Sequence, residues 1–189
     1  FVGFVSRLRF VKQPFFRVKI IAFALSLVGL ILITTSACKA IASSQLNGKW
    51  YLVETEQEET ERLQAIDEVT QHLKSFQQDM ARSRLVERTS PPRMLSIAIE
   101  EAIVAITTED GRIELELEAP PVEVLGDQGT AYVSAKLDSP LLIITVRSAG
   151  GKRRTSYSAD RDRLTAEVTL TSSFLTKSLK YVSTYAPAQ

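Results

Sequence analysis

Short runs of alternating apolar and polar residues, separated by turn residues, follow one another over residues 94–185. In the clearest run, Ile113 and Leu115 alternate with glutamates. Alternation with a period of two is typical of a strand that buries one face. Asp110-Gly111 and Gly150-Gly151 are hairpin turn signals, so consecutive strands are expected to pair as neighbours. The sequence therefore predicts an antiparallel meander.

The predicted domain covers residues 46–189 and is mainly β. A run of aromatic and apolar residues over 46–53 adds a first strand ahead of the others. The remaining candidate strands lie at 94–99, 103–108, 112–118, 130–137, 141–146, 152–158, 164–171 and 179–185. One apolar face per strand indicates a barrel or a strongly curved sheet of about eight strands around one core.

The stretch between the first two strands has helical character. Glutamates open it and Lys74, Arg82 and Arg84 close it, an order that suits the helix dipole. Apolar residues recur at steps of three and four, namely Leu63, Ile66, Val69, Leu73, Phe76 and Met80. We predict one long amphipathic helix over about 56–85, inserted after the first strand. Its apolar stripe is expected to pack on the sheet. A homodimer or an envelope protein bound through the helix is the alternative.

The first 37 residues have the parts of an export signal. Five of the 23 basic residues and none of the 22 acidic residues precede Cys38. Residues 20–37 are uncharged and mostly apolar, and small residues stand before the cysteine. The 18-residue run is also long enough for a short membrane anchor. In either case the remainder of the chain is expected outside the cytoplasm.

Thr35-Ser36-Ala37-Cys38 resembles the lipobox of bacterial lipoproteins. The resemblance implies that 1–37 is a cleaved signal peptide, that Cys38 carries the lipid, a palmitate-containing anchor, and that 38–45 is a tether to the membrane. Lys39 follows the cysteine where an aspartate favours retention at the inner membrane, so an outer-membrane location is expected if the envelope has two membranes.

Composition excludes several functional classes. The chain has one cysteine and one histidine, His72, so cysteine clusters, zinc sites and Ser-His-Asp catalysis have few ligands or bases to use. From Cys38 onward the formal charge is about −4, which disfavours nucleic acid as a partner. His72 is expected on the polar side of the helix. We expect no metal, no cofactor and no enzymatic activity.

Two charged groups remain. Glu114, Glu116 and Glu118 fall on the polar face of a strand and are interpreted as a solvated row. Lys152-Arg153-Arg154, with Arg147 nearby, forms a basic cluster. Consecutive residues of a strand point to alternating faces, so the three cannot all point inward. An exposed edge is one interpretation, and contact with anionic lipid headgroups or phosphate-bearing glycans is the other.

Gly48-x-Trp50 at the start of a β meander resembles the first-strand signature of lipocalin-like proteins. That resemblance implies that Trp50 closes one end of a barrel whose interior admits a small apolar or amphipathic ligand. The lining would include inward positions of several strands. These are Trp50, Leu95, Ile97, Ile113, Leu115, Val133, Ile143 and Val168. The alternatives are a structural or interaction lipoprotein with a closed core and, third, a hydrolase that assembles a serine or threonine with His72 and an acid.

Overall fold

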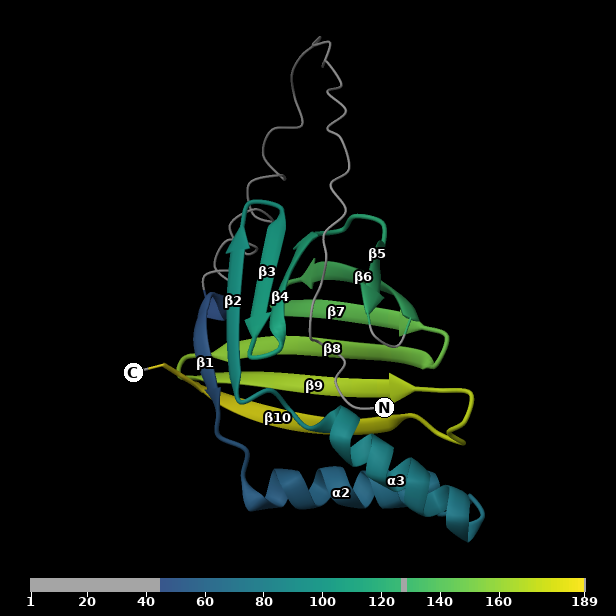
Figure 1. Ribbon diagram of the computed structural model, residues 1–189. Coiled ribbons are helices and arrows are strands. Elements are labelled where there is room, and N and C mark those ends of the chain that lie inside the picture. The colour runs from purple at the N-terminus through teal and green to yellow at the C-terminus, as the bar shows by residue number, and fades with distance from the viewer. Residues whose placement is uncertain (1–44, 127–128, 189) are drawn as a thin grey trace, which may run out of the picture.

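The computed structural model describes residues 45–126 and 129–188 (Figure 1). The predicted signal peptide 1–37, Cys38 and the tether up to residue 44 lie outside the described residues. The described chain forms one antiparallel sheet that curls around its own apolar face, with two helices beside it.

The sheet contains ten strands, where the sequence predicted about eight. They are β1 (Gly48–Leu52), β2 (Met94–Glu100), β3 (Ile103–Thr108), β4 (Gly111–Glu116), β5 (Val122–Gly126), β6 (Gly129–Asp138), β7 (Leu141–Ser148), β8 (Gly151–Asp160), β9 (Arg163–Thr171) and β10 (Leu179–Pro187). Their order is β4-β3-β2-β1-β10-β9-β8-β7-β6-β5, so each neighbour in the sheet is a neighbour in the chain except where β1 joins β10.

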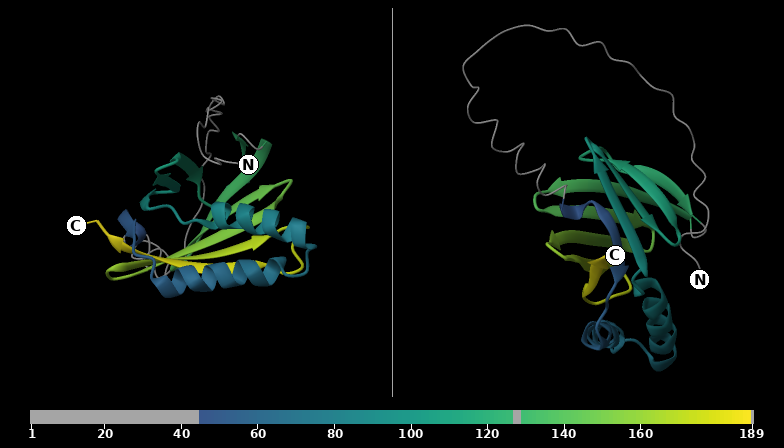
Figure 2. Two further views of the ribbon diagram at one scale, coloured as in Figure 1. Left: turned by 60° about the horizontal axis from the view of Figure 1, so that its bottom comes forward. Right: turned by 90° about the vertical axis from the view of Figure 1, so that its left-hand side faces the viewer.

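The two ends of the sheet approach each other without full pairing. β4 and β5 are the end strands. Just after β4, Leu117 forms an isolated bridge with Ala135 of β6, and Glu118 donates its backbone N–H to the Ala135 carbonyl at 2.9 Å. This contact joins the β4 end to the other side of the sheet, so the meander forms a nearly closed barrel (Figure 2).

Two helices follow β1, where the sequence predicted one. α2 (Glu56–Thr70) begins with a capping box, in which Thr55 accepts from the Glu58 N–H and the Glu58 side chain accepts from the Thr55 N–H. α3 (Ser75–Thr89) ends before Ser90-Pro91-Pro92, because a residue that precedes proline is disfavoured in helical conformation.

The turn at residues 71–74 returns the chain along the same end of the sheet (Figure 1). A continuous 30-residue helix would be about 45 Å long and would extend past its apolar support. Folding back lets Leu85 of α3 pack into the same cluster as Ile66 and Val69 of α2. The predicted stripe is therefore correct for α2 and wrong for Phe76 and Met80, which are 78% and 38% exposed.

The inner surface of the barrel carries two adjoining apolar clusters. The larger one surrounds Trp50 and contains buried residues of β1–β4, β6, β7, β9 and β10, with partly buried residues of β5 and β8 packed against it. The second joins Val168, Leu179 and Tyr181 to the two helices. In the β9–β10 register, Leu164 pairs with Tyr185 and Val168 with Tyr181, so both clusters lie on one face of the sheet. The helices thus cover one end of that face. Neither of the described helices is long and apolar enough to cross a bilayer.

Gly151 provides a test of the β7–β8 hairpin. Its φ is +140°, and a Cβ there would lie 2.2 Å from the Thr171 carbonyl oxygen, whereas the nearest atom to a Cβ at Gly150 is 3.7 Å away. We expect Gly151→Ala to lower the free energy of unfolding by about 2–3 kcal/mol, because strained backbone and a clash with backbone act together. Gly150→Ala is the matched control and should change it little. Urea unfolding of both variants measures the difference, and equal losses would contradict this account of the hairpin.

Candidate functional site: the barrel interior

Trp50 lies at the end of the interior opposite the helices. Its side chain is 4% exposed, and its indole Nε1 donates to the Leu46 carbonyl at 3.1 Å. Gly48 lies beneath the indole, because a Cβ on it would stand 3.6 Å from Trp50 Nε1. Asn47 ties this segment to β2, since its side chain bonds both the carbonyl and the N–H of Ile99. The Gly-x-Trp pattern therefore places a tryptophan inside the barrel and across one end of its core.

Most of the positions predicted to line the interior do point into it. Trp50, Leu95, Ile97, Leu115 and Val133 belong to the larger cluster, and Ile113 packs against that cluster. Val168 also points inward, but it lies in the second cluster beneath the helices. Their predicted contact with a ligand stays a prediction.

The inward placement predicted for Ile143 is wrong. Ile143 pairs with Lys136 and Ser156, whereas its neighbours Leu142 and Ile144 belong to the larger cluster. Alternation along β7 therefore places Ile143 on the outer face of the sheet. The run Leu141–Val146 is apolar at nearly every position, so its sequence carries no signal for which residues point inward.

A group of polar side chains occupies the inner face of β8 and β10. Arg153, Thr155 and Tyr157 alternate along β8 on the side that carries Val146, Ile144 and Leu142 of β7. Across β9 from them, Tyr181, Ser183 and Tyr185 alternate along β10. We call these six residues the interior polar group. It runs from the helix-covered end of the interior toward the Trp50 end.

Two members of this group have hydrogen-bonding atoms without a partner. Arg153 Nε and Ser183 Oγ are both buried and bond nothing among the described residues. Arg153 also forms no ion pair with an acid in the described part of the chain. A buried donor that lacks a partner is costly, so such atoms call for a physical explanation.

The pKa shifts of the three tyrosines in the interior polar group agree with their position inside the barrel. Burial raises the pKa of Tyr157, Tyr181 and Tyr185, and the Arg153 guanidinium opposes the rise at each of them. All three hydroxyls therefore stay protonated at neutral pH and can donate hydrogen bonds. Arg153 is close enough to all three to act on them electrostatically.

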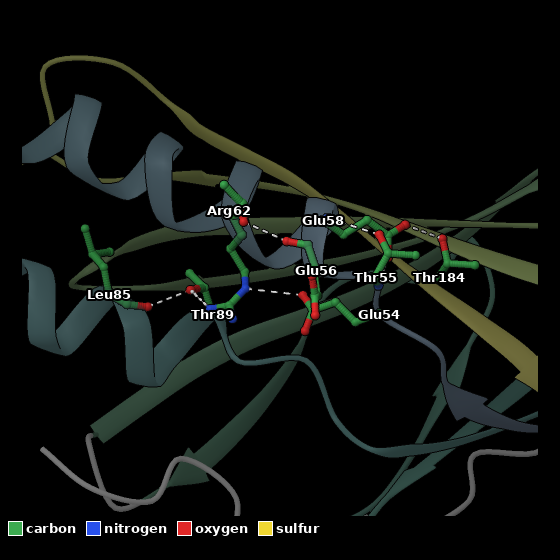
Figure 3. A network of polar contacts seen from close by, with 9 residues as sticks. Glu54, Thr55, Glu56, Glu58, Arg62, Leu85, Thr89 and Thr184 are labelled. Carbon is green, nitrogen blue, oxygen red and sulfur yellow. Dashed lines mark hydrogen bonds and ion pairs between the residues drawn. The ribbon is translucent and has the colours of Figure 1, made fainter.

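A buried ion pair borders this group beneath the helices (Figure 3). Arg62 of α2 lies 3.4 Å, Nε to Oε1, from Glu54, which precedes the helix, and its Nη1 donates to Thr89 Oγ1 at the end of α3. Thr89 in turn donates to the Leu85 carbonyl. Arg62 thereby connects the start of α2 to the end of α3. Glu54 and Arg62 both act electrostatically on Tyr181, which places the pair next to the interior polar group.

Other predicted candidates lie away from the interior. His72 is exposed in the turn between the helices, and Glu114, Glu116 and Glu118 are exposed, as predicted. Among residues 45–126 and 129–188, no group of His, Cys, Asp and Glu has the arrangement of a metal site. The interior instead offers guanidinium and hydroxyl donors within an apolar wall, an arrangement suited to holding the polar head of an otherwise apolar molecule.

The interior polar group was not predicted, although the sequence contained a signal for part of it. In the segment 179–185, every second residue is Leu, Tyr, Ser and Tyr, so a strand that buries Leu179 must also bury Ser183. For Arg153, strand alternation predicted only that its side chain and those of Lys152 and Arg154 lie on opposite faces of the sheet.

Comparison with solved structures shows a shared fold. A secretory abundant heat soluble protein from Ramazzottius varieornatus aligns with a TM-score of 0.52 and 11% identity over 76% of this chain and 96% of that one. Fatty-acid-binding protein 1 of Echinococcus granulosus aligns with a TM-score of 0.50 and 10% identity over 77% and 99%. No protein-family model and no curated protein sequence matches the chain. The described domain thus shares the lipocalin-like β-barrel fold of these proteins.

The Arg62–Glu54 pair supplies a prediction about stability. The two side chains are 6% and 14% exposed. Arg62→Met leaves Glu54 buried without a cation, so we expect the free energy of unfolding to fall by about 2–4 kcal/mol. In a Glu54→Gln background, Arg62→Met should lower the free energy of unfolding by less, because no buried carboxylate is left without a cation. Urea unfolding of the four proteins of this double-mutant cycle gives the interaction free energy between Arg62 and Glu54.

The pH dependence gives an independent readout of the same pair. Burial raises the pKa of Glu54 above 4.5, and Arg62 opposes the rise. The folded state then holds this proton more tightly than the unfolded state, so Glu54 makes stability fall as pH rises from 4.5 through the folded pKa. Removing Arg62 should raise the folded-state pKa of Glu54 further. The free energy of unfolding should then fall by more, and over a wider range of pH. Identical pH profiles in the wild type and in Arg62→Met would show that the two groups do not interact.

Proposed function

We propose that the barrel is a non-catalytic carrier that holds one small amphipathic molecule, with an anionic head at the interior polar group and an apolar body in the larger cluster. The observation that carries the proposal is the pair of buried, unpartnered atoms Arg153 Nε and Ser183 Oγ. A carboxylate or another anionic head beside Arg153 would accept a hydrogen bond from its Nε and would offset the uncompensated charge of its guanidinium.

The apolar surroundings support the rest of this ligand. Val146 and Leu170 flank Arg153 in the register, and Ala166 lies between Tyr157 and Ser183. Beyond them lie Leu142, Leu164 and the residues around Trp50. A molecule anchored by its head at Arg153 would therefore direct an apolar body along these side chains, where burial of each methylene contributes about 0.8 kcal/mol.

The similar structures agree with this proposal without deciding the ligand. One of them is by name a fatty-acid-binding protein, and a fatty acid is an apolar chain with an anionic head. At 10% identity the likeness extends to the fold. The choice of an anionic head for this chain rests on the unpaired guanidinium of Arg153.

Adjacent arginines on opposite faces of β8 allow a matched test. The variants are Arg153→Met, which removes the inward guanidinium, and Arg154→Met, which removes an outward one. We expect Arg153→Met to weaken binding of dansyl-labelled undecanoic acid roughly 10- to 100-fold, because one charge-assisted interaction is lost. Arg154→Met should bind as the wild type does. Titration of fragment 45–189, followed by dansyl fluorescence, measures both.

The neutral methyl ester of the same probe separates charge recognition from apolar binding. Its affinity should be nearly equal in the wild type and in Arg153→Met. Circular dichroism and thermal unfolding check that the variants fold. If the wild type bound neither probe, the closed-core interpretation, a structural or interaction protein of the envelope, would replace the carrier.

We propose further that the barrel is exported and anchored by lipid on Cys38. The support is the lipobox-like Thr35-Ser36-Ala37-Cys38 after an uncharged apolar run. In a bacterial host fed labelled palmitate, the wild type should take up label and Cys38→Ser should take up none. Globomycin should leave the wild type as an unprocessed precursor of higher mass. A wild type that stays unlabelled and membrane-bound would favour the uncleaved anchor.

A further inference from the structure

Four basic side chains gather on the outer face of β7, β8 and β10. The inward residues Val146 and Arg153 pair with each other, so their neighbours Arg147, Lys152 and Arg154 point outward. Arg154 pairs with Thr169, and Thr169 pairs with Lys180. All four basic residues are exposed. We call Arg147, Lys152, Arg154 and Lys180 the outer basic patch. The strands that carry it belong to the run β7–β10, which lie side by side in Figure 1.

The register within this patch is electrostatically unfavourable for the isolated protein. Arg147 and Lys152 are directly opposite each other across β7 and β8. Like charges at directly opposed positions of an antiparallel pair destabilise the sheet. None of the four forms an ion pair with an acid in the described part of the chain. The nearest acids in the register, Glu123 and Glu167, lie at the margins of the patch.

The remaining residues of the patch are suited to a phosphate-bearing surface. Hydroxyl side chains stand between the basic ones, namely Thr145, Thr169 and Thr171. Tyr132 pairs with Arg147 at the edge of the patch and is 47% exposed. Tyrosine is enriched at the membrane interface, where its ring meets the headgroup region and its hydroxyl meets water. Basic, hydroxyl and aromatic side chains thus share one face of the sheet.

The arrangement is an open sheet face, which favours an extended anionic partner over a single enclosed ion. Strands lie about 4.8 Å apart, and side chains of one face recur about every 7 Å along a strand. The basic side chains of the patch are therefore spread both along the strands and across them. The domain from Cys38 onward has a formal charge of about −4, so a negative surface repels its other faces and orients this one toward itself.

We propose that the outer basic patch docks the barrel on an anionic membrane surface through the phosphates of its lipid headgroups. The lipid bilayer is the partner we favour because both anchors considered for this chain, lipid on Cys38 and an uncleaved apolar run 20–37, would hold the barrel at a membrane. The docking face is opposite to the interior wall that carries Arg153. The proposal depends neither on the ligand nor on the form of the anchor.

The test uses the full chain in vesicles and a reporter inside the patch. Tyr132→Trp places an indole beside Arg147, while the native Trp50 is buried and contributes a constant background. In vesicles of brominated phosphatidylglycerol and phosphatidylcholine, we expect bromine to quench the introduced indole, and less so at high salt. Brominated phosphatidylcholine alone should quench it weakly. Ile103→Trp, at a 51% exposed position on β3, is the control site and should be quenched weakly in both.

Removal of two patch charges should weaken docking. Each basic side chain near an anionic surface contributes about a fivefold factor, so Arg147→Gln/Lys152→Gln should lower the docking constant roughly 30-fold. Lys49→Gln/Arg112→Gln removes two exposed charges from β1 and β4 and should leave it unchanged. Equal quenching in both kinds of vesicle, or quenching that survives Arg147→Gln/Lys152→Gln, would overturn the proposal. So would binding of a soluble anionic glycan by the patch without quenching in vesicles.

Discussion

The antiparallel register of β7 through β10 determines which side of the barrel each basic side chain occupies, and both proposed binding surfaces depend on it. Arg153 and Arg154 are neighbours in the chain, yet one faces Leu170 and the other Thr169 across β9. A slip of one residue would exchange them, because the period of a strand is two. Leu142, Leu164 and Ala166 resist that slip, since it would expose their buried side chains. Apolar burial thus holds one arginine inside the barrel and the others outside.

The ends of the interior are closed by different means. At one end, Trp50 packs with Leu46 and binds its carbonyl. At the other, α2 and α3 cover Val168, Leu179 and Tyr181. The helices are tied to the sheet by side chains as well as by apolar contact: Glu58 accepts from Thr184 Oγ1, and Lys177 pairs with Glu68 at 2.7 Å. The Trp50 end is part of the sheet itself, whereas the helical end is an added layer fixed at separate points.

The sequence predicted what strict alternation encodes and missed what other forces determine. The meander, the helix insertion and most inward residues followed from period-two and helical patterns, as in Ile113 and Leu115. Ile143 was assigned to the wrong face because its strand is apolar throughout. β5 was missed because Pro120-Pro121 precedes a short segment with Val122 and Leu125 exposed. The break between α2 and α3 depends on the length of the sheet end, a tertiary property that helical periodicity does not encode.

The difference between the two interior arginines supports Arg153 as the site of the proposed anionic head. Arg62 and Arg153 both act on Tyr181, so the helix-covered end of the interior holds two guanidinium groups. The charge of Arg62 is compensated, because Glu54 lies beside it, although Arg62 Nε and Glu54 Oε1 stand 3.4 Å apart without a hydrogen bond. Arg62 Nη1 donates to Thr89 Oγ1. Among the described residues Arg153 has hydroxyl neighbours but no acid in an ion pair with it, so the uncompensated positive charge of the described interior belongs to it. An anion at Arg62 would have to displace Glu54 and break the connection between the helices, whereas an anion at Arg153 would supply the partner that the fold lacks. Connection of the two helices and the proposed recognition of an anionic ligand therefore involve separate arginines around one tyrosine.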